Sequence, residues 1–166
     1  FAVHVYLAKS AANYAQKSYG TAAQIISPLG IDTHQLGLVK TQRMIAGEKH
    51  CRKLNLISVS TFSPYKRLEL IHQVFRLLRV AGLVDTWTHF GGSQKDIDTF
   101  LETSESEGLV FAGQLDNQKY RSLMSEIRCP LFINLSSTEG MPVTIMEAMQ
   151  FGIPVVATDV GSTSDL

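Results

Sequence analysis

The sequence has little of several features that would assign a functional class at once. Its 15 lysines and arginines equal its 15 aspartates and glutamates, so no overall charge draws it to nucleic acid or to anionic lipid. No apolar run approaches the roughly 20 residues that span a bilayer, and the start does not resemble a signal peptide. We therefore expect a cytoplasmic protein with no nucleic-acid partner, leaving open peripheral association with the inner face of a membrane.

Cysteine and histidine are scarce as well. Cys51 and Cys129 are the only cysteines, and they lack the spacing of a metal site or a redox pair. We expect both to be reduced and structural. The five histidines are scattered and show no metal-ligand pattern. His89 lies within an expected strand, so we expect a core residue with satisfied hydrogen bonds.

Hydrophobic residues make up 45% of the chain and charged residues 18%, which is typical of an ordered globular protein. Apolar strands alternate with helices, a pattern typical of a doubly wound parallel sheet of the Rossmann type, in the α/β class. The expected strands are 2–7, a strand running into a turn over 24–32, 55–60, 86–90, 109–112, 131–135 and 155–157. The expected helices are 10–19, 64–80, 94–103, 117–126 and 142–151. The polar stretch 33–53 is expected to be a linker or a mobile loop.

The chain begins at Phe1, without methionine, and stops at Leu166, where a further helix would be expected after a strand and a turn. We therefore expect a piece of a longer protein, truncated at both ends. On this interpretation any enzymatic turnover needs segments that lie outside these 166 residues.

The most informative stretch surrounds two carboxylates, Glu139 and Glu147, which lie eight positions apart. An apolar strand enters the turn that holds Glu139, and a short helix holds Glu147. Loops at the carboxyl ends of parallel strands are where open α/β sheets bind ligands. Carboxylates accept hydrogen bonds from a diol, and N–H groups near Gly140 and Met141 can donate to sugar or phosphate oxygens. The pattern favours a hydroxylated anionic ligand, although two solvated glutamates would show the same spacing.

A second candidate is the first strand-to-helix junction, Ser58–Arg67. We expect Ser63 to cap the helix over 64–80 and Lys66 and Arg67 to lie in its first turn. Cations in that turn oppose the helix dipole, and phosphates bound there would remove the conflict. Alternatively, both side chains extend into solvent.

Two glycine-containing turns follow the next two expected strands, at Phe90–Ser93 and Ala112–Gln114. Both would line the same cleft, where their backbone could contact a base or a sugar. The glycines can equally reflect turn formation alone.

Together, these residues resemble the carboxyl-terminal, donor-binding half of a retaining glycosyltransferase of family 4, the group-1 enzymes with two Rossmann-like domains in a GT-B fold. The similar segments, in chain order, are 27–32, 63–67, 112–113, 134–142, 146–148, 152–154 and 157–161. The resemblance assigns residues 1–20 to the end of the acceptor domain. It makes 21–52 the inter-domain connection and 53–166 the nucleotide-sugar-binding domain.

The resemblance implies transfer of a hexose from a UDP- or GDP-sugar to a saccharide or lipid-linked acceptor, in polysaccharide or glycolipid biosynthesis, with no metal or other cofactor. By position, Glu139 corresponds to the glutamate that contacts the donor sugar, and Glu147 to the one that binds the ribose hydroxyls. Lys66 corresponds to the lysine that neutralises the diphosphate. Glu139 and Lys66 would be the catalytic residues. The family is usually described by front-face displacement, in which the leaving phosphate takes the acceptor proton.

The resemblance also implies backbone contacts with the donor. Gly140, Met141 and Pro142 correspond to the loop whose N–H groups meet the sugar hydroxyls. Base selection would depend on the loop at Gly113 and Gln114.

Two departures from the family pattern concern the phosphate site and the last turn. Thr61 stands where many members have a phosphate-binding arginine, a loss for which Arg67 would compensate. Ser162 stands where a second glycine is common. Two alternative functions make different demands on the sequence. A dinucleotide-binding oxidoreductase requires a glycine fingerprint, and 60–66 contains no glycine. A non-catalytic nucleotide-sugar-binding or assembly module would keep the same donor residues.

Overall fold

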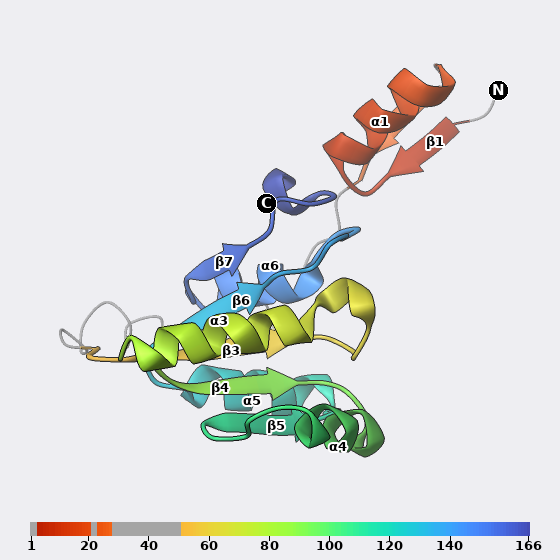
Figure 1. Cartoon of the computed structure of the whole chain (residues 1–166). Helices are drawn as coiled ribbons and strands as arrows, with labels where there is room; N and C mark the ends of the chain where they lie inside the picture. The colour runs from red at the N-terminus through yellow and green to blue at the C-terminus, as the bar shows by residue number, and fades with distance from the viewer. Residues whose placement is uncertain (1–2, 21–22, 28–50) are drawn as a thin grey trace.

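In a computed structural model that describes residues 3–20, 23–27 and 51–166, the larger part of the chain forms a five-stranded parallel sheet (Figure 1). The strand order is β5-β4-β3-β6-β7. In chain order the strands are β3 (Leu54–Val59), β4 (Val84–Phe90), β5 (Leu109–Gly113), β6 (Pro130–Asn134) and β7 (Val155–Ala157). The expected Rossmann-like α/β fold is confirmed.

Helices cover both faces of this sheet and create two apolar layers. On one face, α3 (Leu68–Val80) and α4 (Gln94–Glu102) pack on a cluster that includes Leu56. On the other, α5 (Asn117–Glu126) and α6 (Val143–Gln150) pack on a cluster that includes Ile57. Because successive side chains of a strand point to opposite faces, a continuous apolar strand serves both layers.

The helix expected over 64–80 is not continuous. A 3₁₀ helix, η1 (Pro64–Lys66), is followed by Arg67 in the left-handed conformation, with φ 50° and ψ 47°, and α3 begins at Leu68. Ser63 makes no capping hydrogen bond through its side chain. Ser63 stands at the N-cap position and Lys66 lies in the single turn of η1, as predicted, but the side-chain cap and the place of Arg67 in a helical turn are wrong. Glu69 occupies the first turn of α3 instead, where an acidic side chain suits the dipole.

A disulfide joins Cys51 to Cys129 at the edge of the sheet where the strands begin. Cys51 precedes β3 and Cys129 precedes β6; these strands pair, and the Cα atoms of the two cysteines lie 5.9 Å apart. The prediction of reduced cysteines is therefore wrong, because pairing of neighbouring strands brings together residues 78 positions apart. Disulfides are typical of oxidising compartments, so this bond counts against the predicted cytoplasmic location, which stays a prediction.

Residues 3–20 and 23–27 form a smaller unit that extends away from the large sheet (Figure 1). Its elements are β1 (Val3–Tyr6), α1 (Lys9–Tyr19) and β2 (Ala23–Ile26), with β1 and β2 paired in parallel. Asp165, in the 3₁₀ helix η2 (Thr163–Asp165), accepts hydrogen bonds from Ser10 N at 3.0 Å and Ser10 Oγ at 2.8 Å. The carboxylate thus caps α1. The domain boundaries stay a prediction, and most of the expected linker lies outside the described residues.

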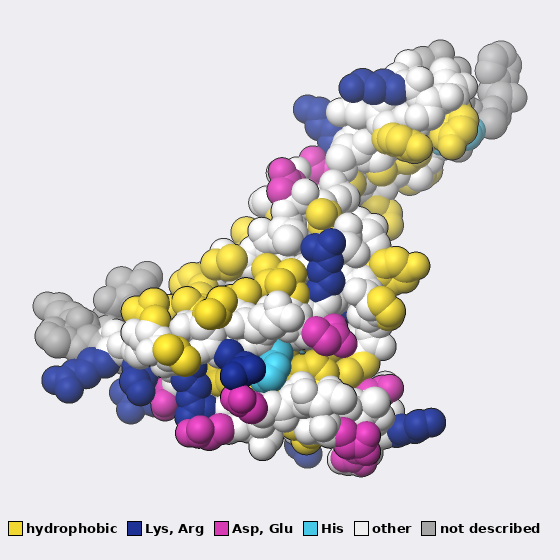
Figure 2. Space-filling model, viewed as in Figure 1, with side chains coloured by type: hydrophobic (Ala, Val, Ile, Leu, Met, Phe, Trp, Pro, Cys, Tyr) yellow, Lys and Arg dark blue, Asp and Glu magenta, His cyan; other side chains and the backbone are white. Residues whose placement is uncertain are grey.

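The outer surface over α3 is apolar, above a band of mixed charges (Figure 2). Leu77, Val80 and Leu83 are largely exposed there. Basic side chains nearby pair with acidic ones, as Arg76 does with Glu105 at 2.9 Å. In the described ranges, no helix combines the length and hydrophobicity that crossing a membrane requires.

Candidate functional site

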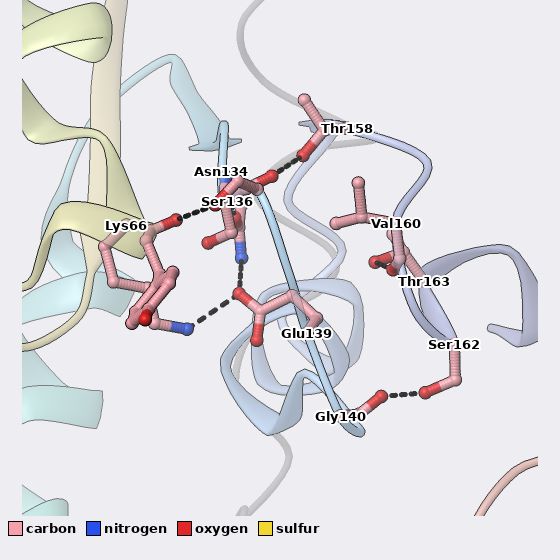
Figure 3. Close-up of polar contacts among 11 residues, drawn as sticks. Lys66, Asn134, Ser136, Glu139, Gly140, Thr158, Val160, Ser162 and Thr163 are labelled. Carbon is pink, nitrogen blue, oxygen red and sulfur yellow. Dashed lines mark hydrogen bonds and ion pairs between the residues drawn. The ribbon is translucent and has the colours of Figure 1, made fainter. Parts of the chain in front are cut away.

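Three loops meet where β3, β6 and β7 end. Ser137 N, after β6, donates to the carbonyl of Tyr65 in η1 at 2.8 Å. Thr158, after β7, donates through N to Asn134 O at 3.0 Å and through Oγ1 to Ser136 O at 2.5 Å. These contacts fix the loop after β6, which contains Glu139, between its two neighbours (Figure 3).

The carboxylate of Glu139 is the centre of this loop cluster. Lys66 Nζ lies 2.8 Å from Glu139 Oε1, and Asn134 Nδ2 donates to the same oxygen at 3.0 Å. Figure 3 shows both side chains pointing at the carboxylate. The side chain of Glu139 is 9% exposed and that of Lys66 is 28% exposed, so the pair is buried on the glutamate side and open on the lysine side.

The environment of Glu139 favours its charged form. Burial acts to raise the pKa of Glu139, but hydrogen bonds from Lys66, Ser136 and Asn134, together with the charge of Lys66, hold the pKa below its usual range. A carboxylate in this state accepts hydrogen bonds and does not donate them. The geometry therefore suits recognition of ligand hydroxyls at neutral pH.

The backbone around Glu139 is packed too closely to accept a larger neighbour. Gly161, at φ +60°, lies so near that a Cβ there would come within 1.8 Å of the Glu139 carbonyl oxygen. Ser162 Oγ donates to the carbonyl of Gly140 (Figure 3). The serine that departs from the family pattern thus closes the loop through its side chain, and Gly161 supplies the space.

Glu147 on α6 forms a second ion pair. Arg121 on α5 donates to Glu147 Oε1 through Nη2 at 2.8 Å and through Nε at 3.3 Å. Their side chains are 15% and 6% exposed. Glu147 is therefore not a solvated helix residue. Sequence reasoning missed Arg121, since a cation on a polar helix is ordinarily solvent-exposed and nothing in its spacing indicates a partner 26 residues away.

A tyrosine adds a third group to this pair. Tyr120 OH lies 3.3 Å from Met124 Sδ and is close enough to Glu147 for the carboxylate to shift its pKa. Burial raises the pKa of Tyr120, and the negative charge and hydrogen bond of Glu147 raise it further. The phenol thus stays a hydrogen-bond donor beside the carboxylate.

His89 belongs to a buried chain of hydrogen bonds near the end of β4. Trp87 Nε1 donates to Ser58 Oγ at 2.8 Å, Ser58 Oγ lies 2.8 Å from His89 Nδ1, and His89 Nε2 lies 3.2 Å from Ser60 O. One neutral tautomer satisfies all three bonds, with Nε2–H donating to the carbonyl. Burial lowers the pKa of His89 to about 4. The expected role as a satisfied core residue is confirmed.

Glycines allow the loop after β4 to approach the loop after β3 closely. A Cβ on Gly91, at φ +115°, would come within 2.1 Å of Ser60 O. Gly91 N also donates to Gly113 O at 2.8 Å. The loops after β3, β4 and β5 therefore touch through backbone atoms. Close approach thus adds to the turn formation that the sequence indicated.

The remaining predicted site residues are less closely joined. Gly140 is exposed, Met141 is partly exposed and Pro142 is buried, all in the loop after β6. Thr61 and Gln114 are exposed in the loops after β3 and β5. The structure places them at the same edge of the sheet as Glu139, and their roles stay predictions.

Arg67 is exposed directly after η1. It lines an open hollow of about 640 Å³ together with residues of η1 and the start of α3. The lining residues are Phe62, Ser63, Pro64, Arg67, Leu68, Glu69, Leu70 and Gln73. Neither Lys66 nor a site glutamate lines it, so nothing in this geometry supports a shared phosphate role for Arg67.

The described residues form no metal-binding group. Within 3–20, 23–27 and 51–166, no three or more histidine, cysteine, aspartate or glutamate side chains are grouped to hold a metal ion. Lys66 and Arg121 each lie beside a site carboxylate instead. The expectation that donor binding and transfer require no metal cofactor stays a prediction.

Two curated proteins share sequence with this chain. The "Putative teichuronic acid biosynthesis glycosyltransferase TuaC" of Bacillus subtilis is 36% identical over 64 residues, 39% of this chain. The "Putative colanic acid biosynthesis glycosyltransferase WcaL" of Salmonella typhimurium is 27% identical over 112 residues, 63% of this chain. The matched segments span 16% and 28% of the lengths of these two relatives, so the chain corresponds to a minor part of each.

Solved glycosyltransferases share the fold at low sequence identity. A mutant of S. aureus TarM in complex with fondaparinux, alpha-GlcNAc-glycerol and UDP superposes with a TM-score of 0.73 at 20% identity. The superposition covers 97% of this chain and 31% of TarM. WaaG, a glycosyltransferase involved in lipopolysaccharide biosynthesis, gives a TM-score of 0.68 at 19% identity, covering 97% and 45%.

The family model of "Glycosyl transferases group 1" matches residues 41–166. The match includes the five-stranded sheet, both site carboxylates and both of their cationic partners. The chain therefore belongs to the group 1 glycosyl transferases.

Proposed function

We propose that this chain is the donor-binding part of a retaining glycosyltransferase. It would transfer a hexose from a UDP- or GDP-sugar to a saccharide or lipid-linked acceptor, in polysaccharide or glycolipid biosynthesis. Family membership and the polysaccharide-related names of TuaC and WcaL support the class of reaction. The observation with most weight is the pair of sequestered carboxylates, Glu139 and Glu147, each beside a cation near the ends of the strands.

Lys66 would bind the diphosphate. Its ammonium group has three N–H donors, so it can keep the 2.8 Å contact with Glu139 Oε1 and still donate to phosphate oxygens. The lysine is the more exposed partner of the pair, which leaves it accessible to a ligand. When the donor bond breaks, negative charge grows on the departing phosphate, and a cation already in place stabilises that charge.

The two glutamates would recognise different parts of the donor. Glu139 lies next to the lysine and to the exposed backbone of Gly140, so it suits the sugar attached to the second phosphate. Glu147 lies on α6 and is held from α5, which suits the ribose of the nucleotide. The loop at Gly113 and Gln114 would then contact the base.

The proposed transfer step keeps the configuration at the anomeric carbon. The acceptor hydroxyl oxygen forms a bond to the anomeric carbon while the bond from that carbon to the phosphate oxygen breaks on the same face. The acceptor proton passes to the leaving phosphate oxygen, so the step requires neither a protein base nor a metal. The acceptor would be bound mainly by the rest of the protein, and peripheral contact of the whole protein with a membrane remains part of the proposal.

Calorimetric titration of the intact protein with UDP, GDP, UDP-glucose, GDP-mannose and NAD tests the proposal. We expect saturable binding of one nucleotide class and none of NAD. Glu147→Ala should abolish that binding, whereas Glu102→Ala, an exposed glutamate at the end of α4, should leave it unchanged. Silence toward all five ligands would contradict the proposal.

Three variants separate the roles further. Glu139→Ala should leave binding of free nucleotide nearly intact and remove the gain in affinity from the sugar. Lys66→Ala should weaken binding of the nucleoside diphosphate far more than that of the nucleoside. Donor binding by the intact protein without transfer to any acceptor would favour the non-catalytic module instead.

A further inference from the structure

Arg121 is the one residue of the ion-paired cluster that no sequence motif indicated. Its Nη2 and Nε both donate to a single oxygen, Glu147 Oε1, at 2.8 and 3.3 Å. Because both donors converge on Oε1, they fix the position of that oxygen and leave Oε2 without a contact from Arg121. An arginine fork fixes direction as well as charge, which a lysine cannot do.

Burial makes this contact important. The side chain of Glu147 is 6% exposed, and a buried carboxylate that loses its partner is strongly destabilised. The contacts that the structure describes for its side chain come from α5: the guanidinium of Arg121 and the hydroxyl of Tyr120. Glu139, by contrast, is supported by Lys66, Asn134 and Ser136 together. The orientation of Glu147 therefore depends on Arg121 more than that of Glu139 depends on Lys66.

We propose that Arg121 is a positioning residue for ribose recognition: it holds Glu147 Oε1 so that Oε2 accepts hydrogen bonds from the ribose hydroxyls. The inference rests on the proposed donor-binding function. Arg121 acts through Glu147 and does not itself touch the nucleotide. Loss of the guanidinium lets the carboxylate rotate, and the cost falls on the ribose hydroxyls rather than on the base or the phosphates.

The test compares a ribonucleotide with its 2′-deoxy analogue. We use the intact protein and UDP with 2′-deoxy-UDP, or GDP with 2′-deoxy-GDP if the protein binds guanine nucleotides. The wild type should prefer the ribonucleotide by about tenfold, because a hydrogen bond to a charged group contributes at least that much. Arg121→Met should abolish the preference by weakening ribonucleotide binding alone. Arg121→Lys should retain part of it.

Two further proteins control for folding. Arg121→Met/Glu147→Gln has no unpaired buried carboxylate, and it should bind ribonucleotide as weakly as Glu147→Gln alone, since Arg121 acts through Glu147. Arg76→Met removes an exposed arginine that also pairs with a glutamate, and it should leave the preference unchanged.

Two results would overturn the inference and leave the proposed function standing. One is a wild-type preference retained by Arg121→Met or, if that variant does not fold, retained in full by Arg121→Lys. The other is an equal loss of both nucleotides, which would mean that Arg121 contacts the base or the phosphates directly. A wild type that binds no nucleotide would overturn the proposed function and this inference together.

Discussion

The two edges of the parallel sheet are held together by different chemistry. Where the strands begin, the Cys51–Cys129 disulfide joins the segments that enter β3 and β6. Where the strands end, the loops meet through hydrogen bonds, through the Lys66–Glu139 ion pair and through close backbone contact at Gly161. The edge where the strands begin is held by a covalent bond. The edge where the strands end, called the polar edge below, is held by polar contacts.

This difference separates stability from ligand binding. The disulfide where the strands begin reduces the conformational entropy of the unfolded chain, and this stabilisation does not depend on a bound ligand. At the second edge, each polar contact can be exchanged for a contact with a donor oxygen, because ammonium and carboxylate groups have further hydrogen-bonding capacity. The disulfide at the edge where the strands begin therefore stabilises the fold, while the side chains at the polar edge can still exchange their contacts when a ligand binds.

Reducing the disulfide should have the largest effect on stability. Opening a loop of 78 residues should lower the free energy of unfolding by about 4 kcal/mol. Urea unfolding with and without a reductant measures the change, and Cys51→Ser/Cys129→Ser should be insensitive to the reductant. Nucleotide affinity should stay constant wherever the protein remains folded. A stability that does not respond to reductant would mean that the bond does not form.

Acid should weaken the polar edge through His89. Its pKa falls from 6.5 to about 4 in the folded protein, so the unfolded chain takes up the proton first. The stability from neutral His89 is complete above about pH 6.5 and is lost as the pH falls to about 4, a loss of about 3 kcal/mol.

Urea unfolding of the wild type and of His89→Gln, each at pH 7 and pH 4, isolates this contribution. The variant should be less stable at pH 7 but should lose about 3 kcal/mol less on acidification. Parallel pH dependence of the two proteins would show that His89 is not responsible.

A methyl group at Gly161 should strain the polar edge by about 2 kcal/mol. The cost combines an unfavourable positive φ with displacement of the Glu139 carbonyl. Gly82→Ala is the matched control, since its φ is +72° but nothing lies within 4 Å of an added Cβ. Thermal unfolding should show the larger loss for Gly161→Ala, and equal losses would mean that the loop gives way at no cost.

Lys66→Met should have the smallest effect on stability, about 1 kcal/mol, because the lysine is partly exposed and Asn134 still donates to Glu139. Its effect on diphosphate binding should be far larger. Unfolding and titration on the same sample compare the two losses. A stability loss that exceeds the binding loss would make this ion pair structural.

Much of the fold was predictable because it depends on local patterns. Helix 117–126 and strand 155–157 match the structure residue for residue. Their boundaries follow from the end of an apolar period, which the sequence displays directly. The helix over 64–80 failed at Arg67 because a left-handed residue has no sequence signal when it is not glycine.

The site was predictable in part for the same reason. Glu139 lies in the loop after β6 and Lys66 lies in η1 after β3, so both follow strands that the apolar pattern locates, and the structure brings them to 2.8 Å. Arg121 and the Cys51–Cys129 bond are set by which helices and strands are neighbours. That order is a property of the assembled sheet, and no local period encodes it.

The contact between Gly161 and the Glu139 backbone has a consequence for protein engineering. In a chimera, the loop after β6 could be replaced by that of a relative to change which sugar is accepted. The transplanted loop would then contact the segment after β7 of this chain, with which it does not match. The two segments lie so close that an added Cβ at Gly161 would meet the Glu139 carbonyl oxygen, and Ser162 donates a hydrogen bond to the Gly140 carbonyl. They should be exchanged together as residues 135–162, which also transfers α6 and β7 because these two elements connect the segments.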